Sequence, residues 1–360
     1  MTIKFLQSNK FIRSALCLVL RRKIGSKLFE YSLIRKVYYF DNQHVTPPHT
    51  TTLTHTCAHR HTRAIHDTSD ISISKNYVIY LSDDSSDFSP GLADKLKGCL
   101  SSYLLCKKYE LDFKIYWDEP FELSYYLKPN QYDWVISKTE IIRDSKVSQP
   151  VLIMELANIA FQDWINKWVF KKRIIHRRFM QTHLYTNMIY GVNSYNQAFE
   201  ELFKPSDKLN EMLSEHINSI GKYISVSTRF MGLLGDFRDE DGFNNCLPEN
   251  KAEALLDHSI EVLKKIISET SDEYNIFIAS DSMRFVNRVK QLKRVYFIPG
   301  KIGHSKFKCS EEIISKTFID FFMLKNAHIS YLLKSKEMYG SGFPWLASQV
   351  GGHEFITVEF

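Results

Sequence analysis

A loop of small residues near the end of the chain, MYGSGFPWLASQ at 338–349, has the composition of an anion-binding turn. Gly342 allows the backbone to approach a ligand closely, and Pro344 favours the first turn of a helix. The N–H groups of Gly342 and Phe343 would have no partner inside that helix, so they can bind phosphate oxygens together with the hydroxyl of Ser341. The alternative is an ordinary turn between a strand and a helix.

Two more polar groups follow apolar runs in the same half of the chain. Arg229 lies near the end of KYISVSTRF (222–230), and its planar guanidinium can hold a diphosphate through paired hydrogen bonds. Asp281 and Ser282 follow YNIFIAS (274–280), and the carboxylate could accept hydrogen bonds from a ribose or a base. Alone, Arg229 would be a surface ion-pair partner and the Asp-Ser pair a helix cap. Because ligands of parallel sheets bind beyond the carboxyl ends of strands, the combination predicts a nucleoside-diphosphate site.

The chemistry expected at this site needs no metal. No Asp-x-Asp pair is placed to hold a metal-bound nucleotide, and DFRDEDG (236–242) reads as a loop that caps a helix or is solvated. Arg229 and preorganised N–H groups can instead stabilise the charge that develops on a departing diphosphate. A base for the acceptor hydroxyl would be a carboxylate or a histidine. Asp236, Asp94 and Glu155 are candidates, and the sequence does not single one out.

Composition limits the class of protein. The chain has 360 residues, of which 44% are hydrophobic, enough for two domain cores. Its net charge of +6 favours anionic ligands but is too small for a dedicated nucleic-acid-binding protein, so no nucleic-acid partner is expected. Six cysteines without a Cys-x-x-Cys pair indicate reduced thiols in a cytoplasmic protein. No apolar run approaches the ~20 residues that a membrane-spanning helix needs.

The first 72 residues are expected to lie outside the domains. Residues 1–40 mix many Lys and Arg residues with apolar ones, which predicts either a basic amphipathic segment in peripheral contact with an anionic membrane or a solvated extension. Residues 41–72, rich in His and Thr, predict a linker. Its histidines have no apolar neighbours to fix a ligand geometry, so no metal site is expected there.

Two series of alternating strands and helices follow, at 73–215 and 216–360. The first contains expected strands at 77–81, 113–117, 132–137 and 150–156, a helix that follows the turn at Pro90 and Gly91, and a mostly helical, basic region at 162–203. The second alternates strands and helices regularly to the end of the chain. The expected fold class is α/β, with two facing Rossmann-like doubly wound domains.

Four blocks of the sequence resemble a known family. VSTRFMGLLGDF (226–237), NIFIASDSMRFV (275–286) and the stretch 319–348 are similar to the three motif blocks of GT-B glycosyltransferases related to alpha-1,6-, nodulation and protein O-fucosyltransferases. The segment 89–117 is similar to the glycine turn and first helix of that family. The resemblance covers roughly residues 76 to 352 and is thin between 118 and 215.

This resemblance implies transfer of a sugar, with fucose expected, from a GDP-sugar to an acceptor hydroxyl with inversion at the anomeric carbon. The acceptor would be a glycan or a lipid-linked saccharide bound by the N-terminal domain, and the nucleotide sugar would bind to the C-terminal domain. Ser227 and Phe230 replace a histidine and an arginine of the family motif, and Asp236 lies later than the family's acid. An inactive nucleotide- or partner-binding scaffold is therefore the alternative. The resemblance implies catalytic roles for Arg229 and Asp236 and donor-binding roles for Gly91, Arg229, Asp281, Ser282, His304, Ser341, Gly342 and Phe343.

Overall fold

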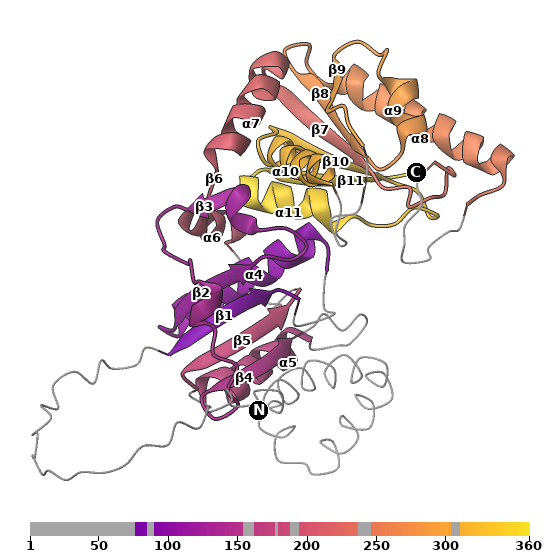
Figure 1. Ribbon diagram of the computed structural model, residues 1–360. Helices are drawn as coiled ribbons and strands as arrows, with labels where there is room; N and C mark the ends of the chain where they lie inside the picture. The colour runs from indigo at the N-terminus through magenta and orange to yellow at the C-terminus, as the bar shows by residue number, and fades with distance from the viewer. Residues whose placement is uncertain are drawn as a thin grey trace, which may run out of the picture.

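The computed structural model of the chain contains two parallel β-sheets, one in each half of the sequence (Figure 1). The residues that the structure describes are 76–84, 90–153, 162–176, 179–187, 194–236, 246–301, 303 and 310–360. The expected segments 1–40 and 41–72 lie outside these residues.

The first sheet has four parallel strands in the order β2-β1-β5-β4. Helix α4 connects β1 to β2, and its residues Leu96 and Leu100 are fully buried. The opposite face of the sheet packs Ile79, Leu81 and Tyr185 against Ile136. The elements of this domain are β1 (Tyr77–Ser82), α4 (Leu92–Lys108), β2 (Asp112–Trp117), β4 (Ser148–Ile153), α5 (Gln162–Phe170) and β5 (Gln181–Thr186).

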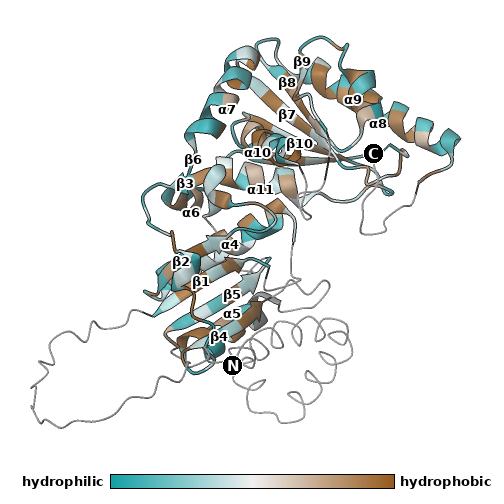
Figure 2. Ribbon diagram, in the orientation of Figure 1, coloured by the Kyte–Doolittle hydropathy of each residue, from teal (hydrophilic) through white to brown (hydrophobic). Residues whose placement is uncertain are grey.

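The second sheet has five parallel strands in the order β11-β10-β7-β8-β9. The chain moves outward from β7 to β9 and then returns to β10, so the winding direction changes between β7 and β10, which is where doubly wound folds bind ligands. Figure 2 shows hydrophilic and hydrophobic bands along α8 and α9, as expected for helices with one buried face. The elements are β7 (Tyr223–Thr228), α8 (Glu249–Glu269), β8 (Asn275–Ser280), α9 (Met283–Val289), β9 (Val295–Phe297), α10 (Glu311–Lys325), β10 (Ile329–Lys334), α11 (Gly342–Gly351) and β11 (Glu354–Glu359).

Helices from both halves pack together between the two sheets (Figure 1). One hydrophobic cluster runs from α4 through α6 (Tyr195–Leu202) to α10 and α11. The ring of Tyr126 stacks on that of Phe318 at 4.3 Å between centroids. Leu127 and Phe203, from a two-stranded antiparallel sheet of β3 (Leu127–Pro129) and β6 (Phe203–Pro205), belong to the same cluster. This shared core sets the position of one domain relative to the other.

The predicted fold class is confirmed, and almost all expected elements form within a few residues of their expected ends. One expectation in the first domain is wrong and another is incomplete. Residues 132–137 form only an isolated bridge, Ile115 to Val135, instead of a strand. Most described residues of the region 162–203 are helical, as expected, but the expectation missed strand β5, which runs through the region and lies between β1 and β4 in the sheet. Strand β5 is fully buried although it contains Thr182, His183 and Thr186, so the apolar pattern of a central strand is missing from its sequence.

The connection between the two sheets contains α7 (Asp207–Ile220), which starts at the N-cap Ser206 and ends at Gly221 with a positive φ of 67°. Residue 215, the expected boundary between the domains, lies inside this helix. Among the described residues, no helix is both long and apolar enough to cross a bilayer.

Candidate functional site

A pocket of about 430 Å³ is lined by residues of both halves of the chain. Its first-domain wall is the start of α4, from Gly91 to Lys97. Its second-domain wall contains Arg229 after β7, Asp281 after β8, and the loop and first turn of α11 after β10. The pocket therefore lies at the carboxyl edge of the second sheet and includes the β7–β10 position where the winding direction changes.

Six of the residues expected to bind the donor meet in this pocket. They lie on four separate stretches of the chain and all belong to the pocket lining: Gly91, Arg229, Asp281, Ser341, Gly342 and Phe343. His304 and Glu155 lie outside the described residues. Asp236 and Ser282 are described but are not among the lining residues.

Two helices present their N-termini to the pocket without a side-chain cap. Gly91 is the N-cap of α4 and has no side chain, and the hydroxyl of Ser341, the N-cap of α11, accepts no capping hydrogen bond. The first N–H groups of both helices are therefore available, and the helix dipoles favour a negative charge in front of them. Such an arrangement suits a phosphate group.

The side-chain ammonium of Lys97 lies between the two helix starts. A Cβ atom built on Gly342 would lie 3.6 Å from Nζ of Lys97, which also forms an ion pair with Asp94 at 2.6 Å. The Lys97 side chain is only 9% exposed, whereas that of Asp94 is 43% exposed. Lys97 was not among the expected site residues. The only sequence signal for it is the Asp94-Lys97 spacing of three in the first turns of a helix that follows a glycine.

Three buried polar atoms of the pocket residues lack a hydrogen-bond partner within the described part of the chain. They are Oγ of Ser227, Nε of Arg229 and Oδ1 of Asp320. Buried polar groups in folded proteins are nearly always paired, and a buried unpaired group costs about 1–3 kcal/mol. Their concentration in one pocket indicates a polar ligand site.

Asp281 holds the chain that leaves β7. Its Oδ1 accepts a hydrogen bond from the backbone N of Phe230 at 2.8 Å, and its Oδ2 accepts one from that of Met231 at 2.9 Å. Met231 has a positive φ of 49°, so these two bonds stabilise a tight turn directly after Arg229. Burial raises the pKa of Asp281, and the two N–H donors and the charge of Arg229 act against that shift. Asp281 thus positions Arg229 in addition to lining the pocket.

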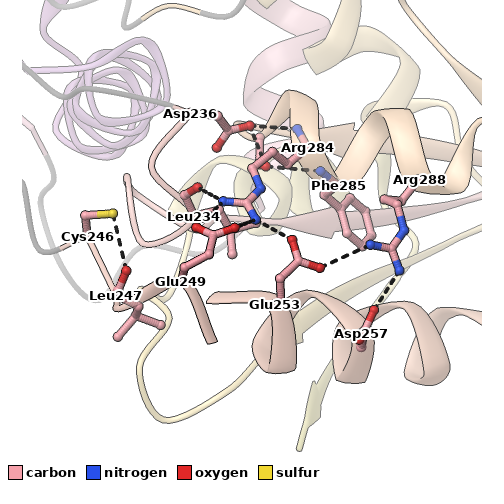
Figure 3. A network of polar contacts seen from close by, with 11 residues as sticks. Leu234, Asp236, Cys246, Leu247, Glu249, Glu253, Asp257, Arg284, Phe285 and Arg288 are labelled. Carbon is pink, nitrogen blue, oxygen red and sulfur yellow. Dashed lines mark hydrogen bonds and ion pairs between the residues drawn. The ribbon is translucent and has the colours of Figure 1, made fainter. Parts of the chain in front are cut away.

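Asp236 and Ser282 stabilise the start of α9, and Figure 3 shows Asp236 beside Arg284 of that helix. Oδ2 of Asp236 accepts hydrogen bonds from the Ser282 hydroxyl at 2.8 Å and from the backbone N of Arg284 at 2.7 Å. The Ser282 hydroxyl also accepts a bond from the backbone N of Phe285 at 3.2 Å. Asp236, the residue of DFRDEDG that the structure describes, thus caps the start of α9.

The two departures from the family motif have different surroundings. The side chain of Ser227 lines the pocket, and its hydroxyl is one of the three unpartnered groups. Phe230 is 1% exposed and packs against Phe285 at 5.6 Å between ring centroids, inside the hydrophobic core of the second domain. The position that carries the second motif arginine in the family is therefore part of a hydrophobic core in this chain.

Asp320 is a pocket carboxylate that sequence reasoning missed. It lies on α10, and its Oδ2 accepts a bond from Nζ of Lys316, one turn earlier, at 2.6 Å. Burial raises the pKa of Asp320, and the Lys316 charge acts against that shift. A Lys-x-x-x-Asp pair on a helix surface is common in sequences, so the spacing alone gave no reason to select it.

This arrangement can bind a doubly charged anion. Arg229, Lys97 and two helix starts surround the space, and the carboxylates in the pocket wall are engaged by a lysine or by backbone N–H groups. No group of three or more His, Cys, Asp or Glu side chains suited to a metal occurs among the described residues. Fold and site together define a two-domain α/β protein with a polar, cation-lined pocket between its domains.

The chain is similar in structure to fucosyltransferases. The alignment with the NodZ alpha-1,6-fucosyltransferase co-crystallized with GDP has a TM-score of 0.47 and 12% identity, and covers 76% of this chain and 92% of that one. The alignment with Arabidopsis thaliana FUT1 in complex with GDP has a TM-score of 0.48, 10% identity and coverage of 97% and 79%. The alignment with POFUT1 in complex with GDP has a TM-score of 0.45 and 8% identity, and covers 80% of this chain and 98% of that one. No protein-family model and no curated protein matches the sequence.

Proposed function

We propose that the chain is a glycosyltransferase that moves a sugar from a GDP-sugar to an acceptor hydroxyl, with inversion and without a metal ion. The observation that carries this proposal is the unpartnered guanidinium Nε of Arg229 in a pocket that also holds two uncapped helix starts. The assignment of guanine as the base and fucose as the sugar rests on the motif blocks at 226–237, 275–286 and 319–348.

In the proposed reaction the diphosphate leaves with increasing negative charge. Arg229 and the N–H groups of Gly342 and Phe343 stabilise that charge, each donor contributing about 2.7–4 kcal/mol to the transition state. Lys97 adds a second cation at the same helix start. No metal is required because these groups do electrostatically what a bound cation does in other transferases.

The base that accepts the proton of the acceptor hydroxyl is proposed to be Asp94. Among the candidate carboxylates named from the sequence, Asp94 lines the pocket, and it is the more exposed partner of its ion pair with Lys97. Asp236 holds the start of α9 and does not line the pocket, so its proposed role is to position the segment after β7. Asp320 is held by Lys316 and is less accessible than Asp94.

We also propose an acceptor class and a cellular location for the reaction. The acceptor is a glycan or a lipid-linked saccharide in surface-polysaccharide or glycoconjugate synthesis, and the protein works in the cytoplasm in peripheral contact with a membrane. The net charge of +6 and the basic composition of residues 1–40 support an anionic membrane as a neighbour.

A nucleotide-binding scaffold without transferase activity is the second candidate function. It is favoured by Phe230, which places a core side chain where the family has a second arginine. The experiment that separates the two is incubation with GDP-fucose in EDTA, without acceptor, followed by NMR detection of GDP and of the fucose anomer formed first. An enzyme releases GDP and inverted fucose, and the rate falls for Arg229→Ala. A scaffold binds GDP-fucose and leaves it intact.

A further inference from the structure

The outer side of α5 in the first domain exposes two tryptophans. Trp164 is 43% exposed and Trp168 is 49% exposed, and the two lie four residues apart, on the same side of the helix. The described residues expose few other large hydrophobic side chains, and none of those forms such a pair on one helix. Neither tryptophan lines the pocket between the domains.

The exposure follows from the periodicity of the helix and its π-helical continuation, Lys171–Ile175. Asn166, Phe170 and Ile174, also spaced by four, are buried and anchor the inner side of the helix. Trp164 and Trp168 lie on the other side of the helix, and nearly half of each residue remains exposed.

The same outer side continues into lysines. Lys171 and Lys172 follow Trp164 by seven and eight residues and are both exposed. Nζ of Lys171 lies 5.7 Å from the ring centroid of Tyr109, and Nζ of Lys108 lies 6.0 Å from it, so a third cation borders the surface. Trp164, Trp168, Lys171 and Lys172 are called the Trp-Lys face below.

The Trp-Lys face is remote from the pocket. It contacts Tyr109 at the C-terminal end of α4, whereas the pocket is formed by the N-terminal end of the same helix. A helix of 17 residues is about 25 Å long. A large partner could therefore cover the Trp-Lys face and leave the pocket open.

We propose that the Trp-Lys face docks on the surface of an anionic lipid bilayer. Indole rings bind at the boundary between headgroups and acyl chains, because they combine a large apolar surface with one N–H donor. Lysines beside them are attracted to anionic headgroups. A soluble polyanion would use the lysines but would give the tryptophans no apolar phase to enter. This inference is independent of the proposed transferase activity.

The test is flotation of the full-length chain with phosphatidylcholine vesicles, with and without phosphatidylglycerol. We expect binding to the anionic vesicles only. Lys171→Glu/Lys172→Glu should weaken binding by at least roughly 30-fold, because each cation near an anionic surface contributes about fivefold. Trp164→Ser/Trp168→Ser should weaken it by at least about tenfold, because the inserted apolar area is lost.

Matched variants elsewhere act as controls. Lys264→Glu/Lys265→Glu reverses two exposed charges on α8, and Tyr125→Ser removes another exposed aromatic, and neither should change vesicle binding. Residues 1–40 are present in every variant, so a selective loss reports on the Trp-Lys face itself. Each variant should keep the melting temperature of the wild-type chain.

Tryptophan fluorescence gives a second readout. Emission should shift to the blue on anionic vesicles, and the shift should disappear in Trp164→Ser/Trp168→Ser. Trp117 and Trp134 are already buried, and Trp345 is partly buried against the core on α11, away from this face. Unchanged vesicle affinity of the folded Trp-Lys variants would overturn the proposal. Binding of heparin to this face with no binding to anionic vesicles would also overturn it and would identify a polyanion site instead.

Discussion

Nζ of Lys97, on the first helix of the N-terminal domain, lies 3.6 Å from the position of a Cβ atom on Gly342, the first residue of α11 in the C-terminal domain. The two uncapped helix starts therefore face one cation across the domain boundary. An anion bound at Gly342 would be contacted from both domains. Substitutions at these positions should therefore differ in their effects on GDP binding and on turnover.

Gly342→Val should weaken GDP binding by roughly tenfold or more while the protein stays folded. The valine would fill the space in which backbone N–H groups approach a phosphate. A Cβ at this position meets only Lys97 Nζ, at an ordinary contact distance, so the fold itself tolerates a side chain. The measurement is the Kd of GDP by calorimetry.

Gly340→Val is the matched control for that variant. Gly340 lies in the same loop, and a Cβ built on it meets no atom within 4 Å. Gly340 also lines the pocket, but it precedes the helix whose first N–H groups would bind the phosphate, so Gly340→Val should weaken GDP binding much less than Gly342→Val. Equal effects of the two substitutions would show that the loop is perturbed in general and would contradict a specific role of the α11 start.

Lys97→Ala and Asp94→Asn should separate binding from turnover. Lys97→Ala removes a charged hydrogen-bond donor from the pocket, so the Kd of GDP should rise by about 10- to 100-fold. Asp94→Asn frees Lys97 from its 2.6 Å ion pair, so GDP should bind at least as tightly while kcat falls. Steady-state kinetics with calorimetry checks both, and a loss of GDP affinity in Asp94→Asn would contradict the assignment.

Arg229→Ala should lower kcat/KM for GDP-fucose turnover by roughly 10²–10³-fold, because the guanidinium stabilises charge that develops in the transition state. The fold should be retained, since Nε of Arg229 has no partner within the described structure. Arg288→Ala is the matched control, because Arg288 forms exposed ion pairs with Glu253 and Asp257 on α8, outside the pocket (Figure 3). If Arg229→Ala is folded and has the same kcat/KM as Arg288→Ala, then Arg229 does not take part in the reaction.

Most of this fold was predictable because its strands and helices carry strong local patterns. YVIYLS at β1 and NIFIAS at β8 are apolar, flanked by turns, and form where expected. Strand β5 was not predictable, because its buried Thr182 and His183 are stabilised by tertiary packing and neighbouring strands, not by an apolar sequence. The expected strand at 132–137 has a suitable composition but pairs only at Val135. Local propensity does not determine whether a neighbouring strand is available.

His183 should make folding stability depend on pH. Burial lowers its pKa from 6.5 to about 4, so the native state binds fewer protons than the unfolded state between these values. The free energy of unfolding should therefore fall as pH is lowered from about 6.5 to about 4, by up to about 3 kcal/mol. Urea unfolding at several pH values measures this.

His183→Gln should flatten that pH dependence. Burial also lowers the pKa of His353, so a smaller slope of the same sign should persist in His183→Gln. An unaltered slope in His183→Gln would show that His183 is not the group responsible.

The sequence was sufficient to predict which strand ends form the site, but not the role of each residue in it. Arg229, Asp281 and the 341–343 loop were selected because polar residues after parallel strands meet at one edge, and they do meet. Ser282 was selected for the same reason, and Asp236 was selected as a candidate base and through the family resemblance, but both stabilise the start of α9. Helix caps and ligand-binding loops use the same residue types, so only the three-dimensional arrangement separates them. Lys97 and Asp320 come from helices whose sequence patterns indicate nothing unusual.

The most direct test of a metal-independent GDP-sugar site is calorimetric titration of the full chain in EDTA. GDP and GDP-fucose should bind in the presence of the chelator, and UDP-sugars should bind more weakly. Gly342→Val should weaken GDP binding much more than Gly340→Val does. Binding that EDTA abolishes, or tighter binding of a UDP-sugar, would contradict the account.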